Sequence, residues 1–169
     1  AGADAYNVAI GFSAGASITT GIVNTIIGGL AGDALTTGQA NVAIGGEALS
    51  NETDSHSSVA IGYQALATQD ASSGTNTYNV AVGRSAGLSV TTGNINTLVG
   101  GLVGDALTTG DSNVALGYTA LSSETAGHRN VAIGNAALFS QNNTSSTNAY
   151  NTAVGYNAGL SVTTGVDNV

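Results

Sequence analysis

The chain has 169 residues, with ten Asp and Glu against two Arg, and it contains no Cys, Pro, Met or Trp. Its net charge of −8 argues against nucleic acid and anionic membranes as partners. Without cysteine it has neither disulfides nor a thiolate metal site, and no apolar run approaches the ~20 residues of a spanning helix, so we expect no membrane insertion of this segment.

A five-residue motif, Asn-Val-Ala-Ile-Gly or a close variant, recurs along the chain. Copies begin at Asn7, Asn24, Asn41, Ser58, Asn79, Asn96, Asn113, Asn130 and Asn151, and another starts at Asn168. Successive copies start 17, 17, 17 and then 21 positions apart, so four short units make one longer 72-residue unit. Repeats of this length, roughly 20 residues or more, are typical of solenoids, whose coils are stable only against their neighbours. The spacing predicts one all-β, parallel solenoid (a β-roll) over residues 1–169, which we expect to be a window on a longer array.

The first five positions of each unit, counted from the asparagine, predict a short strand and a bend. Position 2 is Val or Thr and position 4 is Ile, Val or Leu, so both are predicted to face the core from one side of the strand. Asparagine at position 1 predicts a ladder of side-chain amides between coils, and glycine at position 5 predicts a sharp bend. The residues assigned to this structural repeat are Asn7, Gly11, Asn24, Gly28, Asn41, Gly45, Asn79, Gly83, Asn96, Gly100, Asn113, Gly117, Asn130 and Gly134.

Position 3 has the opposite parity, so the same pattern places it on the outer side of the strand. It is apolar in every complete copy, and a strand apolar on both faces is normally covered on both. We therefore predict a homotrimer interface at Ala9, Ile26, Ala43, Ala60, Ala81, Leu98, Ala115, Ala132 and Ala153. The alternative is that alanine is a tolerated small residue on a solvated face.

The rest of each unit predicts a second short strand and polar turns. Thr-Thr-Gly precedes the next asparagine in five units, and the four extra residues of the long units, within 69–76 and 141–148, predict a loop that bulges every fourth coil. A threonine array on successive coils suggests ice binding, but here the array lapses after every second coil.

Position 6 varies most and carries four aromatic residues that we expect to be exposed, Phe12, Tyr63, Tyr118 and Tyr156. Aromatic rings beside Asn and Gln stack on sugars, so these residues are candidate glycan contacts. Lateral packing between rolls explains them equally well.

The ionisable residues follow the repeat and form no acid/base pair outside it. His56 and His128 are equivalent across the 72-residue unit and are weak candidates for a metal site through rings of three in a trimer, whereas solvated turn histidines are favoured. Asp33 and Asp105 suit turns, and Glu52 and Glu124 have no partner in sequence. We expect no catalytic residue, no cofactor and no enzyme activity.

The motif, followed by an Ala at position 8 in most copies, resembles the Asn-Ser-Val-Ala-Ile-Gly head repeats of YadA-like trimeric autotransporter adhesins; related repeats occur in bacteriophage fibre proteins. The resemblance covers the whole chain. It implies a left-handed parallel β-roll from each of three chains, packed into an extracellular rod on a bacterial surface or a phage virion. The regular 17/21 spacing and the Thr-Thr-Gly turns depart from the adhesin heads, whose coils are usually shorter.

The predicted function is therefore that of a structural and adhesive fibre segment, a shaft or head that mediates or spaces attachment. Its expected partners are further copies of itself and a host glycan or receptor. Two alternatives stay open: a glycan-binding module along the lateral Tyr and Asn positions, and a monomeric solenoid of the ice-binding kind.

Overall fold

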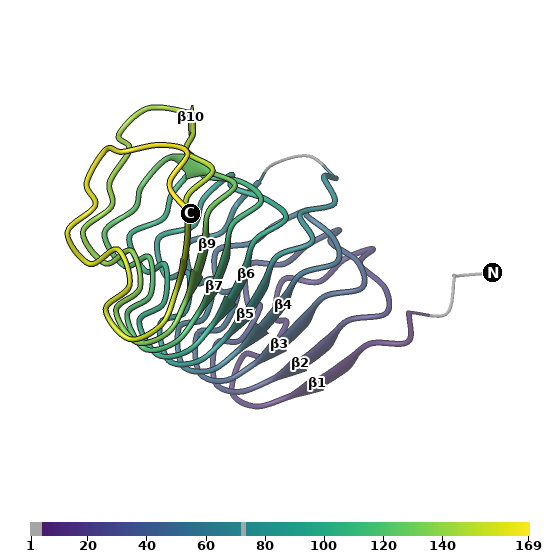
Figure 1. Ribbon diagram of the computed structural model, residues 1–169. Helices are drawn as coiled ribbons and strands as arrows, with labels where there is room; N and C mark the ends of the chain where they lie inside the picture. Colours follow the sequence, from purple (N-terminus) through teal and green to yellow (C-terminus); the bar gives the residue numbers. More distant parts are fainter. Residues whose placement is uncertain (1–4, 72–73) are drawn as a thin grey trace.

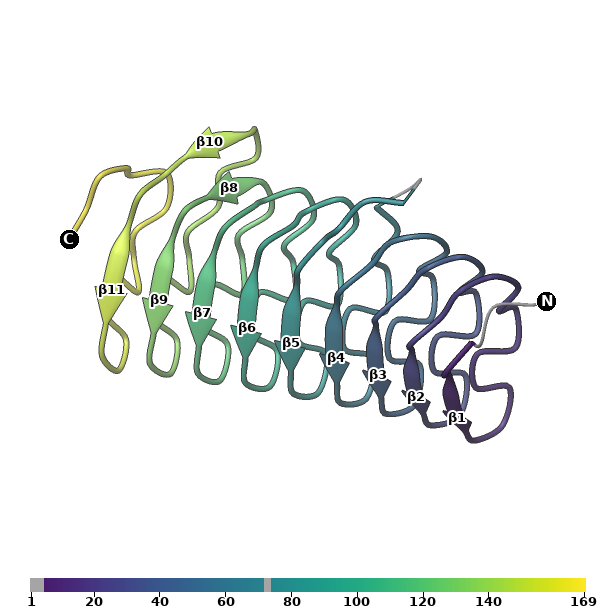
Figure 2. The same ribbon diagram turned by 90° about the vertical axis from the view of Figure 1, so that its right-hand side faces the viewer.

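The computed structural model describes residues 5–71 and 74–169. Within these ranges the chain forms strands and turns but no helix, hence no helix that could cross a bilayer. Nine three-residue strands stack in one parallel sheet along a rod (Figures 1 and 2). They are β1 (Val8–Ile10), β2 (Thr25–Ile27), β3 (Val42–Ile44), β4 (Val59–Ile61), β5 (Val80–Val82), β6 (Thr97–Val99), β7 (Val114–Leu116), β9 (Val131–Ile133) and β11 (Thr152–Val154).

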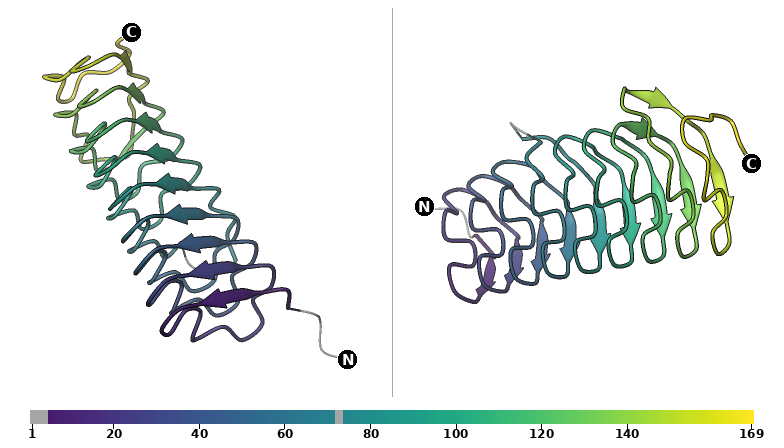
Figure 3. Two further views of the ribbon diagram at one scale, coloured as in Figure 1. Left: turned by 90° about the horizontal axis from the view of Figure 1, so that it is seen from below. Right: turned by 90° about the vertical axis from the view of Figure 1, so that its left-hand side faces the viewer.

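The register of the sheet follows the sequence repeat. Each strand pairs with the strand of the next unit, and equal positions face each other: Ala43 pairs with Ala60, and Ala60 with Ala81 across the long unit. Figure 3 shows the resulting stack of coils, with the strands in a row on one side. The predicted all-β parallel solenoid is thus confirmed.

Each coil contains one strand, where the sequence pattern predicted two. Positions 7 and 9 adopt left-handed backbone conformations, for example Gln64 with φ 57° and Leu66 with φ 49°. A strand needs extended residues, so these positions turn the chain back over the sheet instead. Next to the second of the long loops the chain adds a pair of two-residue strands, β8 (Gly127–His128) and β10 (Thr147–Asn148), which protrudes beside the sheet in Figure 2. At the equivalent place 72 residues earlier, the described residues form a single bridge between His56 and Asn76. The first predicted loop, 69–76, lies partly outside the described residues.

Glycine at position 5 is required for two reasons. Its φ lies between 131° and 141° in all nine copies, a region that is essentially restricted to glycine. It also stacks directly on the next coil: a Cβ on Gly62 would lie 2.6 Å from the carbonyl carbon of Gly83. The predicted bend is present at these glycines.

The asparagines at position 1 join successive coils from inside the rod. Oδ1 of Asn96 accepts the backbone N–H of Asn113 (3.0 Å), and Nδ2 of Asn96 donates to the carbonyl oxygen of Gly110 (2.9 Å). Equivalent bonds recur from Asn24 and Asn41. A ladder therefore runs along the rod, although its main bonds join side-chain amides to the backbone and only some join amide to amide.

Position 3 faces the interior of its own coil, so its predicted orientation was wrong. Ile26, Ala60 and Leu98 are fully buried within the single chain, and among the position-3 residues only Ala9, in the edge strand β1, is exposed. The interface assigned to Ala9, Ile26, Ala43, Ala60, Ala81, Leu98, Ala115, Ala132 and Ala153 is thereby corrected: they belong to the core or, for Ala9, to its open end. The interior of a 17-residue coil is narrow, because the side chains of positions 8, 9 and 12 also occupy it. The single alanine at position 3 fits there, whereas the two branched side chains at positions 2 and 4 of each strand do not.

The interior is filled in alternating pairs of coils. Where position 12 is aliphatic, position 9 is glycine. A Cβ on Gly87 would lie 3.2 Å from Cγ2 of Val90 at position 12 and 2.8 Å from Cδ1 of Leu98 in the next coil, so glycine leaves room for both. In the next two coils position 9 is leucine and position 12 is first Glu and then Gln, all fully buried. Glu52 accepts a hydrogen bond from Nε2 of Gln69 (3.0 Å), and Glu124 accepts one from Nε2 of Gln141 (2.8 Å). The glutamates that lacked a partner in sequence thus find one in the following coil.

Candidate functional site

The outer side of the sheet, formed by positions 2 and 4 of the nine strands, is the first candidate functional surface; we call it the outer sheet face. Its side chains are Val, Thr, Ile and Leu throughout, and none of the nine strands carries a charged residue. In the single chain Ile10, Leu116 and Val154 are 59, 45 and 66% exposed, and the equivalents on the inner strands are mostly half-buried. The molecule therefore presents a continuous apolar strip along one side.

The four position-6 aromatics follow strands β1, β4, β7 and β11 after a single glycine and are all exposed, as their candidate role requires. The Tyr63 ring lies against Gly46 of the preceding coil, and the Tyr118 ring lies against Gly101. Glycine at these places leaves room for a ring to lie along the rod. Phe12 and Tyr156 are the most exposed of the four.

The two histidines are half-buried, and each is tied to the preceding coil. Nδ1 of His56 accepts the backbone N–H of Gln39 (2.9 Å), and Nδ1 of His128 accepts that of Asp111 (2.8 Å). One ring nitrogen of each is therefore engaged within the chain. The described residues contain no group of three or more His, Cys, Asp or Glu side chains arranged to hold a metal ion.

The first threonine of most Thr-Thr-Gly turns also joins coils. Oγ1 of Thr36 donates to the carbonyl oxygen of Thr53 (3.1 Å), and Oγ1 of Thr108 donates to that of Thr125 (2.9 Å). These hydroxyls donate hydrogen bonds between coils, so they are not free to bind an ice lattice.

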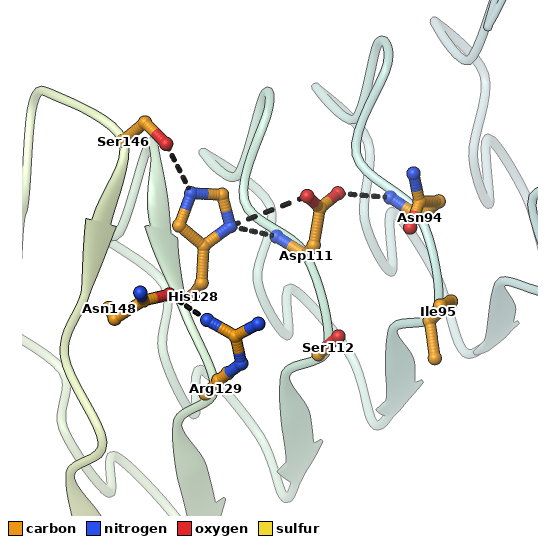
Figure 4. Close-up of a pocket in the computed structure, with 8 residues that line it drawn as sticks. All are labelled: Asn94, Ile95, Asp111, Ser112, His128, Arg129, Ser146 and Asn148. Atoms are coloured by element: carbon orange, nitrogen blue, oxygen red, sulfur yellow. Dashed lines mark hydrogen bonds and ion pairs between the residues drawn. The ribbon is translucent and has the colours of Figure 1, made fainter.

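The second candidate surface is a polar hollow of about 410 Å³ beside the long loop of residues 141–148 (Figure 4). It is lined by residues that directly precede the asparagines of successive coils, namely Asn94, Ile95, Asp111, Ser112, His128 and Arg129, and by Ser146 and Asn148 from the β10 region. Turns of four coils thus contribute to one concave surface, and His128 of β8 and Asn148 of β10 are part of its lining.

Hydrogen bonds fix the side chains around this polar hollow. Oδ1 of Asp111 accepts the backbone N–H of Asn94 (2.8 Å), and its Oδ2 lies 3.5 Å from Nδ1 of His128. Since that Nδ1 accepts a backbone N–H, the ring proton resides on Nε2, which donates to Oγ of Ser146 (2.7 Å). Arg129 donates from Nη1 to Oδ1 of Asn148.

Arg129 is the residue that the sequence pattern missed. Its guanidinium carbon lies 5.6 Å from the centre of the Tyr150 ring, a cation–π contact that, with Asn148, holds the exposed side chain in place. The sequence did offer one indication, since Arg129 and Tyr150 each directly precede the asparagine of successive coils.

Comparisons with family models, curated proteins and solved structures give no match. The features of the chain that bear on its function are therefore the outer sheet face and the polar hollow.

Proposed function

We propose that the chain is a structural segment of an extracellular fibre, a shaft or head of the kind found in trimeric adhesins and phage tail fibres, in which three copies pack through the outer sheet face. The observation that carries the proposal is the apolar, uncharged strip along nine strands, half-exposed in the single chain. Extended apolar strips on soluble proteins mark interaction surfaces, because left open they lead to aggregation.

A further copy of the same chain is the partner that fits this strip. The strip repeats with the 17/21 spacing of the coils and has no charge for a charged partner to complement. An identical copy has the same period and the same side chains, and closed symmetric assemblies bury such self-complementary faces. The choice of three copies and the location outside the cell rest on the resemblance of the motif to the adhesin head repeats.

The shape supports a role in spacing and attachment. A solenoid whose coils each contact only their neighbours is stiff and extends with the number of repeats, which suits a shaft that holds a binding tip away from a surface.

The assembly is tested by measuring molar mass with light scattering. The wild-type chain is expected to give three times the chain mass, and the double variant Ile44→Glu, Ile61→Glu a single chain mass, because buried carboxylates on the outer sheet face oppose packing. Thr92→Glu with Thr109→Glu, on exposed turn residues with the same charge change, is the matched control. A wild-type chain that remains single at high concentration contradicts the trimer.

The second candidate function, glycan binding at position 6, is favoured by the open rings of Tyr63 and Tyr118 along the rod. Flat exposed rings stack on the apolar face of sugars. A glycan array probed with the wild-type chain and with Tyr63→Ala, Tyr118→Ala tests it: binding that the double variant loses supports it. Intact assemblies that bind nothing favour the shaft alone.

A further inference from the structure

The polar hollow carries fixed groups whose hydrogen-bonding capacity the chain does not use. Arg129 donates from one nitrogen to Asn148, and its other two nitrogens have no protein partner among the described residues. The side-chain amide nitrogen of Asn148 is likewise unpaired there. Since Tyr150 and Asn148 already hold the guanidinium, little side-chain entropy remains to be lost when it binds a ligand.

The opposite end of the hollow has different chemistry. Oδ2 of Asp111 lies 3.5 Å from Nδ1 of His128 and accepts no hydrogen bond within the described residues. The hydroxyl of Ser112 and the side-chain amide of Asn94, which also line the hollow, make none there either. Ile95 is 56% exposed and adds an apolar patch. One cationic end and one end with a carboxylate, a hydroxyl and an amide thus face the same space (Figure 4).

We infer that the polar hollow binds an acidic sugar, a pyranose that carries a carboxylate. The carboxylate pairs with the free nitrogens of Arg129, for which the planar guanidinium is suited, and the ring hydroxyls reach Asp111, Ser112 and Asn94. The charge separation fixes the orientation, because the ligand carboxylate is attracted to Arg129 and repelled by Asp111. Ile95 contacts the apolar side of the ring.

The hollow departs from the 72-residue repeat more than the core does. Six of its eight lining residues differ from those 72 positions earlier, among them Arg129, Asp111 and Ser146, which replace Ser57, Gln39 and Gly74. In contrast, Glu124 and Gln141 in the core match Glu52 and Gln69. The hollow thus combines side chains that the coil does not need for stacking.

The test is an array of uronate- and nonulosonate-containing oligosaccharides with their neutral counterparts, followed by calorimetry with methyl glucuronide and methyl glucoside. The wild-type chain is expected to bind acidic sugars and to prefer the glucuronide. Arg129→Ser should lower that affinity about tenfold or more, the loss of one charge-assisted pair of hydrogen bonds. Serine at this place is already present at Ser57, so the variant should fold.

Arg84→Ser is the matched control, because it removes the only other arginine from an exposed site outside the hollow. It should leave binding unchanged, as should Tyr118→Ala, which separates this site from the position-6 aromatics. Equal binding of glucuronide and glucoside, equal losses in the two arginine variants, or no binding to any acidic sugar would overturn the inference. Molar mass measured on the same samples shows separately whether the assembly holds.

Discussion

Gly62 illustrates why every complete copy has glycine at position 5. Its φ of 134° is strained for any other residue, and an added Cβ would lie 2.6 Å from the carbonyl carbon of Gly83. Gly62→Ala should therefore lower the free energy of unfolding by more than about 2 kcal/mol. Gly29→Ala is the control, since nothing lies within 4 Å of its Cβ position and its φ is not positive. Thermal or denaturant unfolding followed by circular dichroism measures both; equal losses would show that stacking does not select glycine.

Asp54 gives a prediction for the dependence on pH. Hydrogen bonds from the hydroxyls of Thr37 and Thr36 (both 2.8 Å) lower the pKa of its carboxyl below the ordinary 3.8. A lowered pKa means that the ionised side chain favours the folded state above about pH 3.8, and that this contribution fades as the pH falls through the lowered value. An NMR titration of the Asp54 carboxyl should show its pKa rise in Thr37→Val. A pKa unchanged in that variant would remove Thr37 as the cause.

The sequence predicted the glycine and asparagine positions well because only a few residue types satisfy their backbone and hydrogen-bond demands. It did not predict the direction of position 3. Alternation shows that positions 2 and 4 share a side, but not which side is enclosed. Which side is enclosed depends on the volume inside the coil. That volume is set by the other buried side chains, such as Leu66 and Leu98 and the residues at the same positions in other coils.

Within a coil, the buried glutamate organises the turn that follows it. Oε1 of Glu124 accepts the backbone N–H groups of Gly127 (2.8 Å) and of Asn143 in the next coil (2.9 Å), and Oε2 accepts from Gln141. Glu124→Ala leaves these donors buried and unpaired, so we expect a loss of about 3 kcal/mol or more in unfolding free energy. Glu47→Ala, which removes one half-buried contact to Gln64, should cost under about 1 kcal/mol. Similar losses in unfolding experiments would mean that the glutamate is not a special element of the turn.

The strand of each coil was predictable from the sequence, but the conformation of the rest of the coil was not. A five-residue motif with a fixed period specifies β4 or β7 by itself. The left-handed conformations of Gln64 and Leu66 have no signature in the sequence, since neither residue type favours them. The polar hollow was equally hidden, because Arg129, Asp111 and Asn148 meet only when three coils stack and β8 pairs with β10.

For the whole molecule, the 72-residue unit predicts which deletions are tolerated. Removing residues 79–150 brings Asn151 behind Tyr78 and restores the contacts that Gln141 makes with Asn151 through the equivalent Gln69. Removing 79–95 takes out Gly87, which separates Cδ1 of Leu98 from Cδ2 of Leu66. The second variant keeps more coils but should melt at the lower temperature, because overpacking destabilises its core. Calorimetry decides between them, and the opposite order would show that the number of coils outweighs the pairing of their interiors.

The backbone hydrogen bonds between coils run along the rod, for example from Val80 to Asn96 and from Thr97 to Asn113. A force along the rod and a force across it therefore act on these bonds differently. A force along the long axis stretches the hydrogen bonds of one coil at a time, so the chain would unfold coil by coil from an end. Each 17-residue coil would release the same length of chain, and each 21-residue coil a greater length. A sideways push is shared by many turns at once. A filament built in this way is stiff against bending yet yields gradually under tension.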